Sequence, residues 1–141
     1  MNKLFICFSA FLLFFTLTAV SPAEQFTVLP SGLEYKDLTV GSGEKAQLGD
    51  TAVIHFVGWL DDNGQPGKEI YNSREAGKPV SFVIGTDNVL QGWNLGVVGM
   101  QPGGTRMLRI PPELGYGSKD VEDVVPPNSY LLFSIELLEL K

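Results

Sequence analysis

The sequence predicts an α+β domain in which an antiparallel sheet packs against one short helix. Five segments between Leu33 and Leu140 are β-branched, aromatic or alternately apolar, which is typical of strands. Only the segment from Val89 to about Val98 repeats its apolar side chains every four residues, as a helix does. Turn-forming Gly, Pro, Asn and Asp residues separate these segments. Many short strands with a single helix favour a helix that covers the concave face of one sheet.

The first 23 residues have the pattern of a signal peptide. Met1-Asn2-Lys3 provides a short positive start, and the run that follows to about Val20 is almost wholly apolar. Ser21-Pro22-Ala23 then places small residues where a signal peptidase cleaves, which predicts a mature chain that begins at Glu24. An uncleaved membrane anchor is the alternative, since about 17 apolar residues is the shortest run that spans a bilayer. We therefore expect a signal peptide over residues 1–23, a flexible leader over 24–30 and one folded domain over 31–141.

The first half of the mature chain predicts strands separated by turns. Leu33 to Leu38 alternates and ends at the turn Gly41-Ser42-Gly43-Glu44. The stretch from Thr51 to Leu60 is β-branched and aromatic, and it is the strongest strand prediction in the chain. The segment from Asp61 to Gly67 is rich in Asp, Asn and Gly and is predicted as a turn or short loop. Val80 to Ile84 is a further short strand.

The second half contains the predicted helix and two more strands. Val89, Trp93 and Val97 share one face of the helix, and Gly92 and Gly96 are expected where the helix approaches the sheet closely. A strand over residues 105–110 follows a Pro-Gly-Gly turn, and the chain ends in a strand over residues 130–140 with alternating apolar side chains.

Composition narrows the possible functions. Removal of the predicted signal peptide, residues 1–23, leaves 118 residues without cysteine, which is long enough for one hydrophobic core that uses no disulfide. These residues carry 9 Lys and Arg against 16 Asp and Glu, a net charge of −7, which disfavours nucleic acid or an anionic membrane as a partner. One His, no Cys and no Gly-rich phosphate loop predict neither a metal site nor a cofactor.

Two segments predict a small apolar pocket. One is the helix start, Val89 to Val97, and the other is Leu114-Gly115-Tyr116-Gly117, followed by Val124-Val125-Pro126-Pro127-Asn128. Together they offer an indole, a phenol and several Val side chains with few polar atoms. Such a lining suits a proline ring better than a charged substrate.

Seven motifs in a fixed order give the chain a family resemblance that covers roughly residues 31–141. They are Val53-Ile54-His55-Phe56-Val57-Gly58, Tyr71-Asn72-Ser73, Val89-Leu90-Gln91-Gly92-Trp93, Met100-Gln101-Pro102-Gly103-Gly104, Leu114-Gly115-Tyr116-Gly117, Val125-Pro126-Pro127-Asn128 and Leu132-Phe133-Ser134-Ile135-Glu136-Leu137. In this order the sequence resembles the FKBP-type peptidyl-prolyl cis–trans isomerases. The resemblance implies an antiparallel half-barrel of five to six strands wrapped around one short helix. It also implies catalysed rotation of Xaa-Pro bonds in proline-containing polypeptides, with no cofactor and no covalent intermediate.

The resemblance also assigns roles to individual residues. Trp93 forms the pocket floor under the proline ring, and Tyr116 directs its hydroxyl at the substrate carbonyl. Tyr71 and Phe133 are walls of the catalytic pocket. Leu90 lies at the helix start, where its backbone N–H has no partner within the helix and is able to donate to a bound carbonyl. The substrate-binding positions are Phe56, Asn72, Val80, Val89, Leu90, Val121, Val124 and Val125.

Several positions depart from the family pattern. Phe56 replaces a Tyr, Asn72 replaces an Asp, and Ala76 lies near the place of the Arg that contacts this Asp, so three members of one polar network change together. Val80 replaces an aromatic wall residue and Val121 a His at the rim. We expect a wider, less polar and less selective pocket, in which Phe56 and Asn72 weaken the binding of macrolide inhibitors.

These observations predict an exported prolyl isomerase that assists the folding of other proteins. A binding or chaperone module with the same fold and little turnover is the rival, because the polar network is altered. His55 lies on a predicted core strand, and we expect it to be a hydrogen-bonded structural residue rather than a general base. A periplasm is the favoured compartment, with a thylakoid lumen or a secretory pathway as alternatives.

Overall fold

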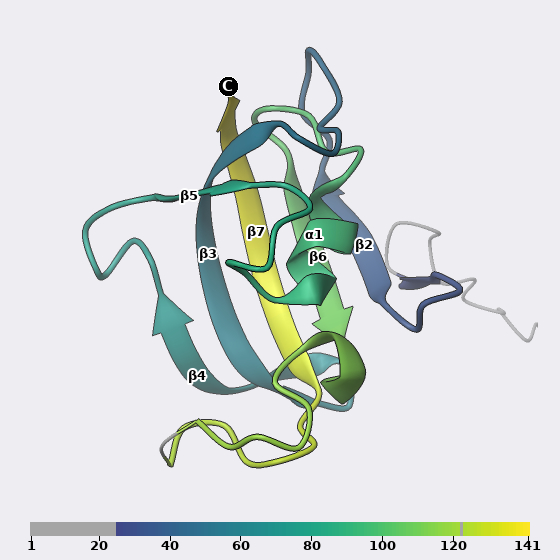
Figure 1. The fold of residues 1–141 in the computed structure, drawn as a ribbon, viewed down its shortest axis with the longest axis vertical. Coiled ribbons are helices and arrows are strands. Elements are labelled where there is room, and N and C mark those ends of the chain that lie inside the picture. Colours follow the sequence, from purple (N-terminus) through teal and green to yellow (C-terminus); the bar gives the residue numbers. More distant parts are fainter. Residues whose placement is uncertain (1–24, 122) are drawn as a thin grey trace, which may run out of the picture.

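The structure, a computed structural model that describes residues 25–121 and 123–141, contains one sheet of seven strands and one α-helix (Figure 1). No helix in the described part of the chain combines the length and the apolar character needed to cross a membrane. The elements are β1 (Thr27–Val28), β2 (Glu34–Thr39), β3 (Thr51–Asp62), β4 (Gln65–Asn72), β5 (Val80–Val83), α1 (Gln91–Val97), β6 (Thr105–Ile110), a 3₁₀ turn (Pro112–Leu114) and β7 (Leu131–Leu140).

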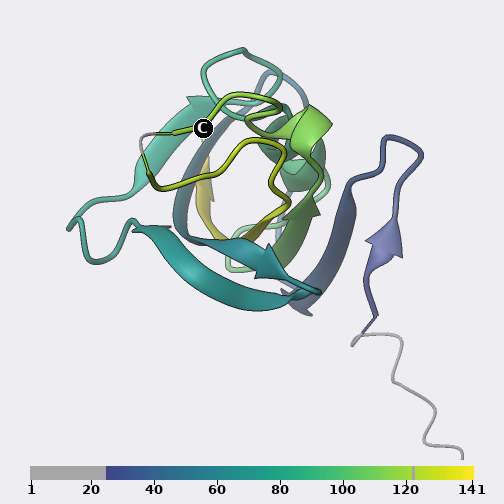
Figure 2. The same cartoon turned by 90° about the horizontal axis from the view of Figure 1, so that it is seen from below.

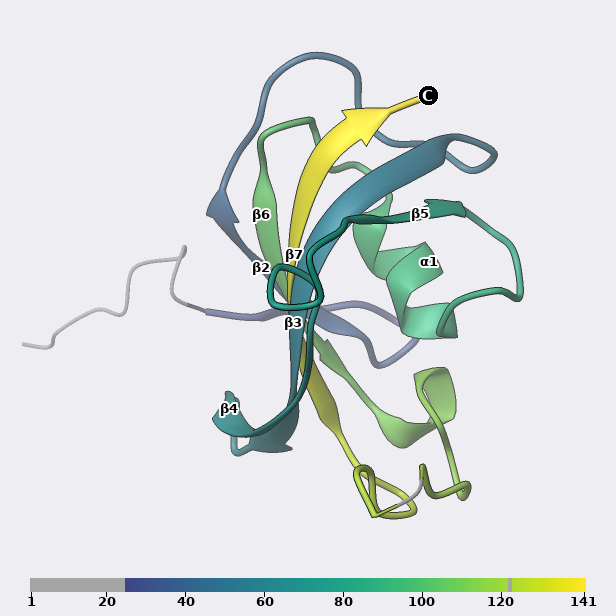
Figure 3. The ribbon, with the colours of Figure 1, turned by 90° about the vertical axis from the view of Figure 1, so that its left-hand side faces the viewer.

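All strand pairs are antiparallel, in the order β1-β2-β6-β7-β3-β4. The long strand β3 pairs with β7 along one edge, and along the other edge with β5 near its start and β4 near its end. The sheet curves around α1 (Figure 2). Figure 3 shows α1 and the loop that follows β6 on the same side of the sheet. The predicted α+β half-barrel is confirmed, with seven strands where five or six were expected.

The extra length of the sheet comes partly from a hairpin in the segment from Asp61 to Gly67, where a turn or short loop was predicted. Strand β3 continues to Asp62 and β4 begins at Gln65, so only Asn63 and Gly64 form the turn. Both turn residues have positive φ, 51° and 83°. This is the backbone geometry that Asn-Gly favours in two-residue hairpins. Pro66 is accommodated because β4 lies at the edge of the sheet, where a missing N–H does not interrupt a ladder.

The segment expected to be a flexible leader over residues 24–30 also contains a strand. Thr27 and Val28 form β1 and pair with Tyr35 and Glu34 of β2. Within the short turn that joins the strands, the Leu29 N–H donates to the carbonyl of Leu33 at 2.8 Å. Thr27 and Val28 thus lie at the edge of the sheet, while the predicted signal peptide, residues 1–23, lies outside the described residues.

Two glycines allow α1 to lie close to the sheet, as predicted. A Cβ atom on Gly92 would lie 2.8 Å from side-chain atoms of Ile110, and one on Gly96 would lie 2.5 Å from Leu108. Both neighbours belong to β6 and are fully buried. Carbon atoms in contact are normally about 3.5–4.0 Å apart, so any side chain at either position would push the helix away from the sheet.

An arginine from the sheet holds the carboxyl end of α1. Arg106 Nη1 donates to the carbonyl oxygens of Gly96 at 2.9 Å and of Val98 at 3.0 Å. Its Nε donates to Asp37 Oδ1 on β2 at 2.7 Å. The last carbonyls of a helix lack intrahelical partners and carry partial negative charge, so a cation is favourable there. Arg106 therefore fixes α1 relative to β2 and β6.

A second ion-pair group lies where β2, β3 and β6 approach one another. Arg109 Nη1 donates to Glu34 at 2.5 Å, and Nη2 lies 3.0 Å from Asp61 Oδ2. The hydrogen bond that Arg109 donates to the Asp61 carboxylate is the largest cause that raises the pKa of Arg109 above its already high value. The guanidinium also lies 4.4 Å from the ring centre of Tyr130. This group joins the strands away from the cavity described next.

Candidate active site

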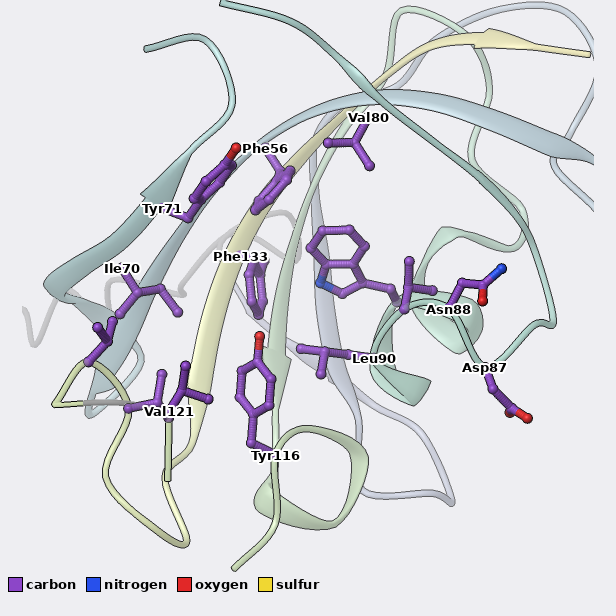
Figure 4. A pocket seen from close by; sticks show the side chains of 14 residues that line it. Phe56, Ile70, Tyr71, Val80, Asp87, Asn88, Leu90, Tyr116, Val121 and Phe133 are labelled. Atoms are coloured by element: carbon purple, nitrogen blue, oxygen red, sulfur yellow. The ribbon is translucent and has the colours of Figure 1, made fainter. Parts of the chain in front are cut away.

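A pocket of about 690 Å³ opens between the start of α1, the curved sheet and the loop after β6 (Figure 4). Its volume lies within the range of small-ligand sites, roughly 300–1,000 Å³. Most of the lining is aliphatic or aromatic. The lining residues are Phe56, Ile70, Tyr71, Val80, Asp87, Asn88, Val89, Leu90, Trp93, Tyr116, Val121, Val124, Val125 and Phe133. The structure thus brings together every residue predicted for the site except Asn72.

Four aromatic rings pack together in the lining of the pocket. Phe56 and Phe133 meet the Trp93 ring edge to face, at centroid distances of 4.6 and 5.3 Å. The ring of Tyr71 stacks on Phe56 at 5.2 Å. Such edge-to-face and offset pairs are favourable arrangements of aromatic quadrupoles. These ring contacts hold the side chains in fixed positions. Trp93, which α1 contributes to the lining, has only 6% of its surface exposed.

The indole nitrogen of Trp93 is the one buried polar side-chain atom in the described part of the chain that has no hydrogen-bond partner. Buried polar groups are normally paired, because desolvation without a partner is unfavourable. An unpaired donor among aromatic rings shows how little polar material this region contains.

Tyr116 projects into the pocket from the loop that follows the 3₁₀ turn. The N–H groups of Gly115 and Gly117 both donate to the carbonyl of Pro112, at 3.1 and 2.8 Å, and so fix the backbone on either side of Tyr116. Figure 4 shows its hydroxyl directed toward Phe133. The side chain is 38% exposed, so its hydroxyl is available to a bound molecule. The contact of this hydroxyl with a substrate carbonyl stays a prediction.

The valine-rich rim, which contains Val121, Val124 and Val125, is held by backbone hydrogen bonds within a tight turn. Val121 and Val125 form an antiparallel bridge, and the Val124 N–H donates to the Val121 carbonyl at 2.7 Å. The side chain of Val125 is buried, whereas Val121 and Val124 are partly exposed. The turn therefore anchors Val125 in the core and presents the other two side chains at the mouth.

The helix begins later than predicted. It starts at Gln91 rather than Val89, because Leu90 has an extended ψ of 140° and serves as its N-cap. At the other end it stops at Val97, one residue before the predicted end. Val89 and Leu90 still line the pocket. Leu90 precedes the first helical residue, so its N–H has no acceptor within the helix.

Asn72, a predicted substrate-binding residue, is not among the residues that line the pocket. Its side-chain oxygen accepts hydrogen bonds from the N–H groups of Arg74 at 3.0 Å and Glu75 at 3.3 Å. Arg74 in turn pairs with Glu136 of β7. A short polar side chain that binds the backbone two or three residues ahead stabilises a turn, which is a role that the sequence spacing itself suggests. Asn72 thus shapes the β4–β5 connection.

Three lining residues, Ile70, Asp87 and Asn88, were not predicted from the sequence. Ile70 and Tyr71 are neighbours on a strand, and neighbours normally point to opposite faces. Gly58 of β3 pairs with Tyr71 of β4, and the next residue, Trp59, pairs with Glu69. Ile70 is therefore left without a partner on β3. A bulge of this kind turns a side chain toward a new direction. Asp87 and Asn88 follow β5 in a loop whose path no sequence periodicity indicates.

His55 lies outside the pocket lining. Its Nδ1 lies 2.8 Å from the hydroxyl oxygen of Ser73, which also accepts the Phe56 N–H at 2.8 Å. Ser73 is completely buried. The predicted structural role of His55 is confirmed, because its hydrogen bond holds the β4–β5 connection against β3.

The chemistry available in this pocket is limited to binding and orientation. Among the described lining residues there is no Ser, Cys, His or Lys, and Asp87 is the only charged side chain. Covalent catalysis needs a nucleophile with a neighbouring base. Asp87 is the one carboxylate in this lining, and Figure 4 shows it away from the aromatic rings, with no second acid–base group beside it among the described lining residues. The pocket is suited to holding an apolar ring while a phenol and a backbone N–H contact polar atoms beside it.

Comparison with known proteins identifies the family. The model of the FKBP-type peptidyl-prolyl cis-trans isomerase family matches residues 42–138. FKBP13, chloroplastic, of Arabidopsis thaliana is 41% identical over 125 residues, which is 81% of this chain and 58% of the relative. The peptidyl-prolyl cis-trans isomerase FKBP53 of the same plant is 37% identical over 125 residues, 87% of this chain, and this chain spans only 25% of its length.

A solved structure gives the same result. The crystal structure of FkpA from Escherichia coli superposes with a TM-score of 0.73 at 40% identity, over 82% of this chain and 51% of that one. The family model covers most of the folded part, including β3, α1, β6 and nearly all of β7. This chain therefore belongs to the family of FKBP-type peptidyl-prolyl cis-trans isomerases.

Proposed function

We propose that this chain catalyses cis–trans isomerisation of Xaa-Pro peptide bonds in exported or folding polypeptides. The observation that carries the proposal is the pocket itself, in which aromatic and aliphatic side chains surround Trp93 and leave room for a proline ring. Membership of the FKBP-type family supports it.

The reaction requires no bond to be made or broken. Rotation about a peptide bond crosses a barrier of about 18–20 kcal/mol, and uncatalysed Xaa-Pro isomerisation takes tens to hundreds of seconds. A catalyst lowers the barrier by binding the twisted amide more tightly than either planar isomer. The twisted amide has lost resonance and its carbonyl is less polar. A pocket that replaces water with apolar side chains therefore favours the twisted form.

The proposed roles follow from the positions of the side chains. Trp93 contacts the proline ring from below, and Phe56, Tyr71 and Phe133 surround it. The Tyr116 hydroxyl donates to the carbonyl of the residue before proline. The Leu90 N–H donates to the carbonyl of the proline itself, which keeps the chain on either side of the ring fixed during rotation. Val80 and Val89 complete the walls, and Val121, Val124 and Val125 form the rim.

The altered polar network predicts a pocket with low selectivity. Phe56 has no hydroxyl, and Asn72 is committed to the turn that follows it. Because the three network positions changed together, no buried partner is left without a hydrogen bond at about 1–3 kcal/mol each. We therefore propose that the pocket accepts varied residues before proline and binds macrolide inhibitors weakly.

An isomerase assay on a short Xaa-Pro peptide tests the proposal. The wild-type protein should exceed the uncatalysed rate by at least about tenfold, equivalent to about 1.4 kcal/mol of the barrier. Tyr116→Phe removes one hydrogen bond of about 0.5–1.5 kcal/mol, so kcat/KM should fall about two- to tenfold. Tyr130→Phe is the matched control, because it removes a phenol hydroxyl beside Arg109, outside the pocket lining.

The outcomes separate the enzyme from its rival. Equal rates with and without protein, together with measurable peptide binding, would leave a binding or chaperone module of the same fold. Equal losses in Tyr116→Phe and Tyr130→Phe would show that the phenol in the pocket has no special role.

We also propose that the domain acts after export, with a periplasm as the favoured compartment. The predicted signal peptide over residues 1–23 supports export. N-terminal sequencing of the protein from the exported fraction tests it. A first residue of Glu24 is the expected result, and an intact Met1 would favour the membrane anchor.

A further inference from the structure

One side of the pocket mouth carries an unneutralised carboxylate. Asp87 is exposed, and it is the only charged residue among the described residues that line the pocket. Figure 4 places it beyond Asn88, on the side of the pocket opposite Val121 and away from the aromatic side chains. The four ion pairs found among the described residues do not include it. A charged group of a bound chain would therefore meet this carboxylate directly.

The opposite side of the mouth is also acidic. Asp120 and Asp123 flank the rim residues Val121 and Val124, and both carboxylates are exposed and absent from the described ion pairs. Lys119 is the only cation in the described residues of this loop. Acidic groups on both sides of an apolar cleft raise the local concentration of cationic segments. The mouth therefore favours basic polypeptides over acidic ones.

The direction of the bound chain decides which substrate residue lies near Asp87. The expected direction rests on the proposed function. With the carbonyl before proline on Tyr116 and the carbonyl of proline on the Leu90 N–H, the chain leaves the pocket past Leu90. Asp87 precedes Leu90 by three residues and lines the same side of the pocket (Figure 4). The residue that follows proline therefore lies nearest to the Asp87 carboxylate.

We infer that Asp87 is a specificity-determining residue that selects substrates with Lys or Arg directly after proline. An exposed pair is weak, so the preference for Lys over an uncharged residue of similar length should be about two- to fivefold. Salt screens exposed charges over about 10 Å at 0.1 M, so the preference should shrink as ionic strength rises. A preference based on shape or hydrophobic contact would not respond in this way.

Three peptides that differ only in the residue after proline test the inference. Lys, Gln and Glu at this position should give kcat/KM values in descending order at low ionic strength. Asp87→Asn keeps the size of the side chain and removes its charge, so the Lys-to-Gln ratio should fall close to one. Glu44→Gln is the control, because it removes one exposed carboxylate from the loop that packs near the carboxyl end of α1. The ratio should remain unchanged in this variant.

Two results would overturn the inference. One is equal kcat/KM for the three peptides. The other is a Lys preference that survives Asp87→Asn, which would assign it to Asp120 and Asp123 instead. If no peptide is isomerised, the proposed function fails, and dissociation constants of the same peptides, measured by tryptophan fluorescence, test the charge preference separately. Tighter binding of the Lys peptide that disappears in Asp87→Asn would then still support the inference.

Discussion

Gly96→Ala tests whether the close approach of α1 to the sheet sets the position of the pocket floor. The added methyl group would lie 2.5 and 2.6 Å from the two Cδ atoms of Leu108 and 3.1 Å from its Cγ. Normal carbon contacts are about 3.5–4.0 Å, so the helix must retreat by about 1 Å or Leu108 must leave its rotamer. Leu108 is fully buried, so a new rotamer would have to fit among side chains that are packed as closely as in a protein interior.

Two opposing contributions determine the expected magnitude. Overpacking a well-filled core destabilises by about 1–3 kcal/mol. Replacement of a helical Gly by Ala stabilises by about 1 kcal/mol, because Ala has the higher helix propensity. The single variant should therefore lose up to about 2 kcal/mol, and its net effect alone is a weak test. The overpacking contribution can be isolated with a second substitution.

Leu108→Ala removes all three atoms that the new methyl group would meet. In this background Gly96→Ala should be neutral or stabilising, although Leu108→Ala itself loses about 2–5 kcal/mol. Urea unfolding of the four proteins gives the coupling energy between the two positions, which we expect at about 1–3 kcal/mol. Gly96→Ala effects that agree within about 0.5 kcal/mol in the two backgrounds would refute the reasoning, since independent sites are additive to that degree. In the single variant, displacement of α1 should also lower kcat/KM, because Trp93 is carried by the same helix.

Two further predictions concern the elements around the site. Arg106→Met keeps much of the aliphatic stem but removes the hydrogen bonds to the Gly96 and Val98 carbonyls and to Asp37. The free energy of unfolding should therefore fall by about 1.5–3 kcal/mol, measured by thermal unfolding. An unchanged unfolding midpoint would mean that the carboxyl end of α1 needs no cation. Gly64→Ala places a Cβ at a φ of 83°, and the stability should fall by about 1–2 kcal/mol in urea unfolding. Wild-type stability for Gly64→Ala would contradict the assigned hairpin turn.

The strands that the sequence predicted well have a strong local pattern. Strand β6 has the predicted bounds, 105–110, and β3 extends only two residues beyond its prediction. The first seven residues of β3 are largely β-branched or aromatic, and a Pro-Gly-Gly turn marks the start of β6. Strand β1 could not be recognised, since two residues carry no periodicity and form a strand only by pairing with β2. The β3–β4 hairpin was recognisable: Asn63-Gly64 is a strong turn signal, but Pro66 and Gly67 obscured the strand that follows.

The predicted site depended on motif order rather than on periodicity. Trp93 and Tyr116 were found in this way, and both side chains line the pocket. Ile70 was missed because it reaches the pocket through a bulge, and a bulge depends on the pairing between two strands. Asn72 was predicted together with its neighbour Tyr71, which lines the pocket, whereas the Asn72 side chain binds the turn ahead of it.

The central claim is that a proline ring binds over the Trp93 indole, and the two tryptophans of the chain permit a direct test. Trp93 lines the pocket and Trp59 does not, so their indole N–H signals in a ¹H–¹⁵N spectrum report on two different places. Titration with a short Xaa-Pro peptide should shift the Trp93 signal and leave that of Trp59 unchanged, while exchange between the cis and trans peptide signals accelerates. A shift at Trp59 alone, or accelerated exchange with no change at Trp93, would contradict the account.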